Sequence, residues 1–349
     1  MNDDQSPQQR HEQNGDVIEV VAAAARPDDA PRKVKVRRRG RVTKWLAIVW
    51  LAFITISAIG ANSLPYIPHD CPGTTSVGCS TALKGDILTK RELPPVWATW
   101  ASADYDTLPG KPTHAGLMGT DQNGRDIFAR AMLGARNSLL IAGLAITFGL
   151  AIGTILGMIA GYFRGWADAV IENLTNILLA FPALLLTIFV VTFFNDPNST
   201  QGAAPRPLWP IITALVILSI PPLTRLVRAN TIAYANRDFV TAARSLGAKR
   251  SRILVREILP NIVPSLLSFA LTGMALLIVA EGALAFLNLS VELPIPTWGK
   301  MIADGSQRLR GGVWWISMMP ALVMFVTLLA INFLGDVLAQ RFNTREAIG

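Results

Sequence analysis

The chain has 349 residues, of which 51% are hydrophobic and only 16% charged, and its formal net charge is +8. An ordinary soluble domain carries about 25% charged residues, so this composition argues against a soluble globular protein. The positive charge does not favour nucleic-acid binding, because much of it lies in one run that is not interleaved with aromatic side chains. We therefore expect an all-α, polytopic membrane protein that contacts membrane lipid and no nucleic acid.

Residues 1–44 are predicted to form a disordered cytoplasmic tail that ends in a basic run. The first part of the tail is polar and contains several acidic residues, a composition typical of disorder. The basic run consists of Arg32, Lys33, Lys35, Arg37, Arg38, Arg39, Arg41 and Lys44. Its position directly before an apolar segment is that of a cytoplasmic anchor beside anionic lipid.

Six apolar segments have the length, about 20 residues, that a helix needs to cross the hydrocarbon core of a bilayer. They cover residues 45–64, 138–163, 170–194, 208–227, 264–289 and 313–337, and the last five would form a transmembrane core over 138–337. The tail and the 228–262 segment carry a surplus of Lys and Arg, which places both in the cytoplasm. An even number of spans then returns the C-terminal tail, residues 338–349, to the cytoplasm.

The second predicted span carries a stripe of glycines. Gly143 is followed by Gly149, Gly153, Gly157 and Gly161, and the last four have a strict four-residue period. Such a stripe lets two helix backbones approach closely, as helices do in lipid. The alternative is a bent helix with no close partner.

Residues 65–137 are predicted to lie outside the cytoplasm, as an insertion followed by an interfacial helix. The insertion contains both cysteines of the chain, Cys71 and Cys79, which either form a disulfide across a short ring or remain two free thiols. His69 stands nearby, but a fourth ligand is lacking, so we expect no metal site.

The end of this segment has the pattern of the interfacial helix. Thr120 or Asp121 is suited to cap it. Apolar side chains would fall on one side of the helix and charged side chains on the other. The apolar set is Ile127, Phe128, Ala131 and Met132, and the charged set is Arg125, Asp126, Arg130 and Arg136.

The 228–262 segment predicts two short helices separated by a glycine. Asn236 is suited to the N-cap of the first helix, and Gly247 to the left-handed residue that ends it. A second, basic helix is expected to stop at Pro260. The apolar face of the first helix comprises Phe239, Ala242, Ala243 and Leu246. This face could dock in a groove on another protein or lie among lipid headgroups.

Glu281 is the deepest acidic residue in any predicted span. An ionisable group at such a depth is costly and is a functional candidate by default. It either faces a translocation path or hydrogen-bonds to a neighbouring helix as a structural lock. We expect the lock, because one carboxylate makes no ion relay.

The chain has no Gly-x-x-x-x-Gly-Lys-Ser/Thr loop to hold nucleotide phosphates and no hydrolase motif. We therefore expect no catalytic residues and no cofactor in this chain. Any energy for its work would come from another protein.

Part of the 228–262 segment resembles the Glu-Ala-Ala…Gly…Leu-Pro loop of bacterial ABC importer permeases. The matching residues are Ala242-Ala243, Gly247 and Ile258-Leu259-Pro260, while Thr241 stands where the family usually has Glu. The resemblance implies a coupling helix that docks in a cleft of an ATP-binding subunit. The coupling residues would be Phe239, Thr241, Ala242, Ala243, Leu246, Gly247, Ile258, Leu259 and Pro260. A salt bridge through the usual Glu is not expected here.

Further segments resemble the dipeptide, oligopeptide and nickel branch of these permeases, and the resemblance covers about residues 118–345. One segment includes Gly119, Thr120, Asp121, Gly124, Arg125 and Asp126. Another runs from Ala280 to Gly299 and contains Glu281, and a third is Asn332–Asp336.

The resemblance implies a permease of the type I ABC importer fold, with six transmembrane helices in the bacterial inner membrane. Its implied partners are a second permease subunit, a pair of ATP-binding subunits that hold ATP and Mg, and an extracytoplasmic solute-binding protein. We expect peptides as the solute, with nickel chelates or another small solute as the alternative. From another class, the alternative is a secondary transporter driven by an ion gradient, for which we see no clear internal repeat.

Overall fold

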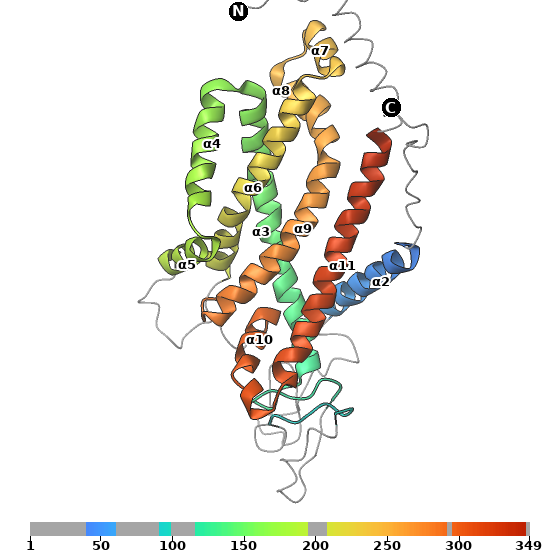
Figure 1. Cartoon of the computed structure of the whole chain (residues 1–349), viewed down its shortest axis with the longest axis vertical. Coiled ribbons are helices and arrows are strands. Elements are labelled where there is room, and N and C mark those ends of the chain that lie inside the picture. The colour runs from blue at the N-terminus through green and yellow to red at the C-terminus, as the bar shows by residue number, and fades with distance from the viewer. Residues whose placement is uncertain (1–39, 61–90, 99–115, 195–207, 292–294, 347–349) are drawn as a thin grey trace, which may run out of the picture. The chain divides into compact units, whose positions relative to one another are not determined.

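The computed structural model describes residues 40–60, 91–98, 116–194, 208–291 and 295–346 (Figure 1). Within these ranges the chain is helical, and its only strand-like pairing is one isolated bridge between Thr120 and Asp126. The all-α prediction is therefore confirmed. Cys71, Cys79 and the predicted N-terminal tail up to residue 39 lie outside the described residues.

Four described helical stretches are long and apolar enough to cross a membrane. They are α3 (Ile127–Phe163), α6 (Trp209–Ala235), the run formed by α8 (Arg250–Arg252), the π-helical turn η2 (Ile253–Ile258) and α9 (Leu259–Phe286), and α11 (Trp315–Glu346). The paired helices α4 (Gly165–Ala180) and α5 (Ala183–Phe194) raise the number to five if they count as one span. In the first apolar helix, α2 (Gly40–Ile59), the apolar stretch Thr43–Ile59 is shorter than the other four, so the predicted count of six is not confirmed.

The third predicted span, residues 170–194, is not one straight helix. Its chain bends by 93° between α4 and α5. The bend falls at Phe181, which has extended backbone angles of φ −83° and ψ 135° and precedes Pro182. A residue before proline is pushed out of the helical region by the proline ring, so a continuous apolar run is still broken here.

The glycine stripe of α3 forms the predicted close helix contact, and the partner helix is α6. A Cβ atom added at Gly153 would lie 2.8 Å from the Cβ of Leu223, and one at Gly161 would lie 2.8 Å from the carbonyl oxygen of Arg228. Gly149 and Gly157 meet α6 at even shorter distances. The two helices therefore pack backbone to backbone over four successive turns of α3, and Gly143 lies outside this contact.

We predict that Gly157→Ala destabilises the protein by about 1–3 kcal/mol, the usual cost of overpacking. The added methyl group would lie 2.6 Å from both the Thr224 carbonyl oxygen and the Val227 Cβ. Gly143→Ala is the matched control, because the nearest atom to its new methyl group is 4.0 Å away. Melting of both variants in detergent tests this, and equal melting temperatures would contradict the close packing.

Two short helices lie at opposite ends of these helices (Figure 1). The short helix α7 (Asp238–Ser245) follows α6 at one end, and α10 (Trp298–Ser306) precedes α11 at the other. A 3₁₀ turn, η3 (Leu309–Gly311), links α10 to α11. Helix α2 joins α11 through a hydrogen bond of 3.0 Å from Trp50 Nε1 to Thr327 Oγ1.

The prediction that the second basic helix stops at Pro260 was wrong. The helix continues through the proline, because the chain passes through the π-helical turn η2 directly before it. The Leu259 amide donates to the Leu254 carbonyl, five residues back. Pro260 then occupies the first turn of α9, where a missing backbone N–H breaks no bond of that helix.

Candidate functional site

Helix α7 is anchored by a single apolar side chain that the sequence reading had not singled out. Val240 is completely buried, in a cluster with Val227 of α6 and with Ile253 and Ile258 of η2. Ala243 and Leu259 pack against the same cluster. Because the cluster draws on α6, η2 and α9, α7 is fixed to the ends of the membrane helices rather than attached by a loose loop.

Gly247 ends this helix in the predicted left-handed conformation, with φ +77°. The Gly247 amide donates to the Arg244 carbonyl at 3.0 Å, and the Ala248 amide donates to the Ala243 carbonyl at 3.1 Å. These two bonds together form a Schellman motif, which glycine favours because a Cβ is strained at positive φ. The direction in which the chain leaves α7 is thus fixed by backbone geometry.

The N-cap prediction for α7 was wrong. Asn236 is the C-cap of α6, and its side-chain amide donates to the Ile232 carbonyl at 3.1 Å. Arg237 takes the N-cap position of α7 without a side-chain capping bond. The preceding helix, α6, runs eight residues beyond the predicted end at Val227, so Asn236 caps the C-terminus of α6 instead.

The outward side of α7 is apolar at the positions predicted for coupling. Leu246 is 89% exposed and Phe239 is 39% exposed, and Ala242 is also exposed between them. Thr241 is exposed beside this face, where it carries no charge. Pro260 is exposed as well, whereas Ile258 lies in the buried cluster.

Two arginines tie this region to the end of α3. Arg244 lies over the ring of Tyr162 and Arg250 over the ring of Phe163, each 5.8 Å from the ring centroid. Such cation–π contacts are worth about 0.5–1 kcal/mol each at exposed sites. They add a third membrane helix to the set that holds α7.

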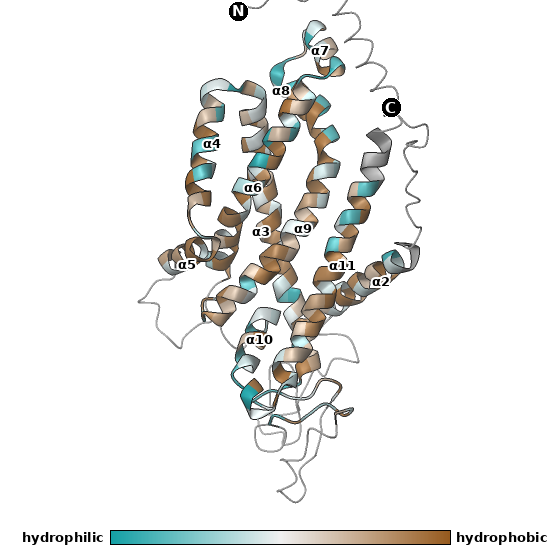
Figure 2. Cartoon of the chain, viewed as in Figure 1, coloured by the Kyte–Doolittle hydropathy of each residue, from teal (hydrophilic) through white to brown (hydrophobic). Residues whose placement is uncertain are grey.

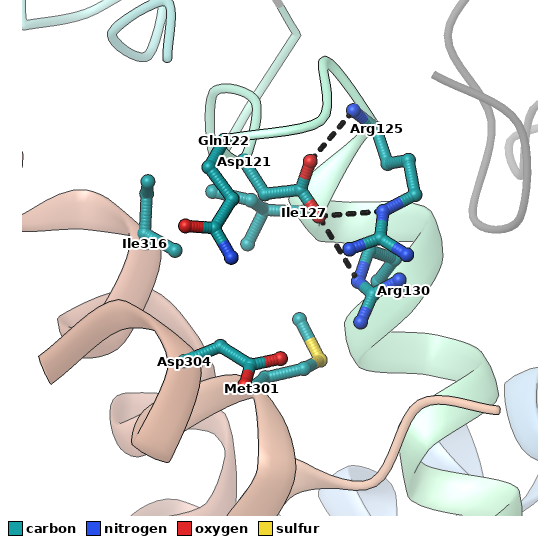
Figure 3. A pocket seen from close by; sticks show the side chains of 8 residues that line it. All are labelled: Asp121, Gln122, Arg125, Ile127, Arg130, Met301, Asp304 and Ile316. Atoms are coloured by element: carbon teal, nitrogen blue, oxygen red, sulfur yellow. Dashed lines mark hydrogen bonds and ion pairs between the residues drawn. The ribbon is translucent and has the colours of Figure 1, made fainter. Parts of the chain in front are cut away.

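A second candidate region, at the opposite end of the bundle, is organised around Asp121 (Figure 3). The Asp121 carboxylate accepts the backbone amides of Asn123 and Arg125, both at 2.9 Å, and the Arg125 Nε at 2.8 Å. Arg130 Nε lies 3.5 Å away, and both guanidinium groups are at least nine-tenths buried. Asp304 of α10 faces the same small pocket, as Figure 3 shows.

The interfacial helix predicted before the second span does not exist as a separate helix. The helix begins at Ile127 and continues without a break to Phe163, and its N-cap is Asp126, not Thr120 or Asp121. Asp126 Oδ1 accepts the Ala129 amide at 2.8 Å. Arg130, expected on a polar outer side, is 2% exposed because Asp121 folds back over it.

Thr120 and the nearby glycines shape the loop that carries Asp121. The Thr120 hydroxyl accepts the Leu93 amide at 2.9 Å, and the Thr120 amide donates to the Leu93 carbonyl at 3.0 Å. Gly119 and Gly124 have φ of +79° and +70°. The loop is therefore pinned to the 91–98 segment on one side and to α3 on the other.

Glu281 lies at the junction of α9 and α10 and is 1% exposed. Its Oε1 accepts the hydroxyl of Ser290 at 2.5 Å and that of Thr297 at 2.8 Å. Thr297 is the N-cap of α10 and also accepts the Lys300 amide. The carboxylate thus joins α9 to the start of α10, the geometry of a lock. The sequence reading missed both partners, since they stand in the loop after the span.

Close packing supports the same junction. A Cβ atom added at Gly299 would lie 2.5 Å from the Gly282 Cα. The indole of Trp298, which is fully buried, donates to the Ala131 carbonyl of α3 at 2.9 Å. Asn137 Nδ2 donates to the Pro296 carbonyl at 2.6 Å. The junction around Glu281 therefore connects α10 to both α9 and α3.

We predict that Glu281→Leu lowers stability by about 2–4 kcal/mol, because two buried hydroxyls lose their acceptor at about 1–3 kcal/mol each. Glu281→Gln keeps a carbonyl acceptor of the same size and should lose less than half as much. Thermal melting of the purified variants in detergent measures both. A leucine variant as stable as the wild type would show that the carboxylate plays no structural part.

The part of the chain that the structure describes contains no group of three or more His, Cys, Asp or Glu side chains arranged to hold a metal ion.

Comparisons with known proteins point to one family. The family model for the binding-protein-dependent transport system inner membrane component matches residues 153–347. The glutathione transport system permease protein GsiD of Pectobacterium atrosepticum is 37% identical over 242 residues, which are 69% of this chain and 77% of that protein. The dipeptide transport system permease protein DppC of Alkalihalophilus pseudofirmus is 37% identical over 234 residues, which are 67% and 73% of the two chains.

The fold has a counterpart among solved structures. An inward-facing structure of the methionine ABC transporter MetNI aligns with a TM-score of 0.51 at 18% identity, over 62% of this chain and 97% of that chain. At this identity the likeness concerns the fold alone. It agrees with the predicted fold class.

Proposed function

Because this chain belongs to the family of binding-protein-dependent transport system inner membrane components, we propose that it forms half of a translocation path for di- or oligopeptides. The relatives named above carry glutathione or dipeptide in their names, and glutathione is itself a small peptide. These names favour peptides over nickel chelates. Membership of this family also argues against a secondary transporter driven by an ion gradient.

The partners follow from the same premise. A second permease would complete the path, a pair of ATP-binding subunits would hold ATP and Mg, and an extracytoplasmic protein would deliver the solute. The chain would sit in the bacterial inner membrane with both termini in the cytoplasm. Its N-terminal basic run and the basic 228–262 segment support this orientation.

The observation that carries the coupling proposal is the exposed apolar face of a firmly anchored α7. Leu246 and Phe239 offer apolar anchors of the kind that helix-in-groove docking uses. Val240, the Schellman motif at Gly247 and the two cation–π contacts hold the helix to α3, α6 and α9. A movement of the ATP-binding subunits would therefore be passed to three membrane helices at once.

In the proposed cycle, ATP closes the two ATP-binding subunits and brings the α7 helices of the two permeases together. The path then opens to the outside and receives the solute, and ATP hydrolysis returns the path to the state that is open to the cytoplasm. The bend at Pro182 and the π-helical turn before Pro260 are places where these helices depart from regular geometry. Both lie in helices that would have to move.

Uptake into proteoliposomes tests the solute. The full complex is reconstituted with its binding protein, and accumulation of a labelled dipeptide is compared with that of a labelled nickel chelate. We expect uptake of the peptide that requires ATP. ATP-dependent uptake of the nickel chelate without peptide uptake would show that the complex transports nickel chelates and not peptides.

A further inference from the structure

The uncovered face of α6 lacks the bulky apolar side chains that face lipid elsewhere in the molecule. Its exposed residues at helical spacing are Pro222, Arg225, Ala229 and Ala233. Beyond Trp209 at its start, α6 exposes no large hydrophobic side chain, whereas α11 exposes Met318, Leu322, Phe325 and Leu329 and α3 exposes a similar row. Small residues and a cation make a poor surface for contact with lipid tails.

Arg225 lies in α6 close to Val227, where the predicted apolar span ends and the basic segment begins. It stands ten residues before Ala235, the last residue of α6, which is about 15 Å along the axis at 1.5 Å per residue. A charged side chain inside a membrane is costly and almost always faces the bundle interior or a water-filled cavity. Its exposed side chain, at the end of the apolar span, is therefore not expected to lie among lipid tails.

The charge of Arg225 is not neutralised by the described part of the chain. Its neighbour on the same helix, Arg228, binds Asp168 at 2.5 Å and Glu172 at 3.3 Å. Arg225 instead donates from Nη2 to the Asn176 Oδ1 at 2.7 Å, and no described carboxylate lies within ion-pair distance. A guanidinium group has five N–H donors, so most of its donors remain available.

Polar groups border this face on both sides. On the α4 side, Asn176 is exposed and the Glu172 side chain is 50% exposed. Figure 2 shows hydrophilic turns in α4, which is otherwise largely apolar. On the other side, Leu226 lines a groove of about 290 Å³ in which Pro264, Phe269 and Ala339 alternate with three hydroxyl residues of α9. They are Ser265, Ser268 and Thr272.

We infer that the exposed face of α6 is a wall of the water-filled translocation path, and that Arg225 binds a carboxylate of the passing solute. A planar guanidinium group pairs with a carboxylate through two parallel hydrogen bonds. Every free peptide carries such a group at its C-terminus. The inference rests on the proposed function, because it assigns the solute group that this chain recognises.

Cysteine labelling tests the water-filled path without any assumption about the solute. In the assembled complex, with Cys71 and Cys79 replaced by serine, Pro222→Cys, inside the predicted span, is compared with Ile177→Cys on α4, where Ile177 is 58% exposed. A charged, membrane-impermeant thiol reagent should modify the cysteine at 222 at least ten times faster. Equally slow labelling at both positions would mean that this face packs against the second permease, and would overturn the inference.

Transport of a peptide and of its C-terminal amide tests the role of Arg225. The ratio of the two uptake rates is measured in the wild type and in Arg225→Gln. The same binding protein is used in both, so its preference between the peptide and the amide affects both ratios equally. We expect the preference for the free carboxylate to fall at least tenfold in the variant. An unchanged ratio, with both rates lowered together, would overturn the assignment.

Asn176→Ala separates recognition from packing. It removes the protein partner of Arg225 but leaves the guanidinium in place, so the preference for the carboxylate should persist. If Asn176→Ala and Arg225→Gln change the ratio alike, Arg225 acts only by joining α6 to α4. A wild-type complex that takes up no peptide would instead refute the proposed function, whatever the labelling shows.

Discussion

Asp121→Ala is expected to lower the free energy of unfolding by about 3–5 kcal/mol, the usual effect of removing one partner from a buried ion pair. The Asp121 carboxylate is 7% exposed and lies between the guanidinium groups of Arg125 and Arg130, which are 6% and 2% exposed. The alanine would also leave the backbone amides of Asn123 and Arg125 without their acceptor. Denaturation of the purified variant in detergent micelles measures the loss.

A surface ion pair near the same end of the molecule supplies the control. Arg91 Nε lies 3.9 Å from Glu92 Oε1, and the Arg91 side chain is 49% exposed. Arg91→Ala should therefore cost at most about 1 kcal/mol, since exposed pairs contribute little. If the two variants were destabilised equally, the cluster around Asp121 would not hold this end of the protein together.

Leu246→Asp is expected to weaken binding of the ATP-binding subunit by about 30-fold or more, the effect of losing an apolar anchor worth about 2 kcal/mol. The side chain is 89% exposed, so the substitution should leave the stability of the permease within about 0.5 kcal/mol of the wild type. Binding of the purified ATP-binding subunit to permease in lipid nanodiscs gives the affinity directly.

The same substitution at the other end of the molecule controls for a general effect of the added charge. Leu309 is 41% exposed and lies in η3, beyond α10. Leu309→Asp should bind the ATP-binding subunit as the wild type does. Equal losses in the two variants, or no loss in either, would contradict docking through α7.

The helical class and the close-packing face of α3 could be predicted because they depend on local composition and spacing, whereas its partner helix α6 could not. Length and hydropathy identify apolar helices, and four glycines at one period mark a surface without side chains. The role of Gly247 was predictable for a similar reason, since a glycine directly after a short amphipathic stretch is typical of the left-handed residue that ends a helix. These features need no knowledge of the rest of the chain.

The contacts of the charged residues could not be predicted, because they depend on distant segments. Arg130 has the sequence pattern of a polar outer residue, and only the fold of the preceding loop places Asp121 against it. Glu281 was recognised as unusual, but Ser290 and Thr297, which bind it, carry no signal in sequence. The role of Val240 could not be predicted, because one valine beside an apolar face does not show which side of α7 packs against the membrane helices.

Two errors have a local physical cause. Several residues near position 121 are suited to cap a helix, and the sequence does not decide among Thr120, Asp121 and Asp126. Proline interrupts a span at Pro182, where the preceding residue turns extended, but not at Pro260, where a π-helical turn leads into it. Sequence alone does not distinguish these two outcomes.

A crosslinking measurement tests the central claim, that α7 docks on an ATP-binding subunit, most directly. Leu246→Cys and, as control, Leu309→Cys are introduced with Cys71 and Cys79 replaced by serine, and each assembled complex is treated with a short thiol-to-amine crosslinker. We expect an adduct between the permease and an ATP-binding subunit from position 246 and none from position 309. An adduct from position 309 with none from position 246 would place the ATP-binding subunit at the other end of the molecule and contradict docking through α7.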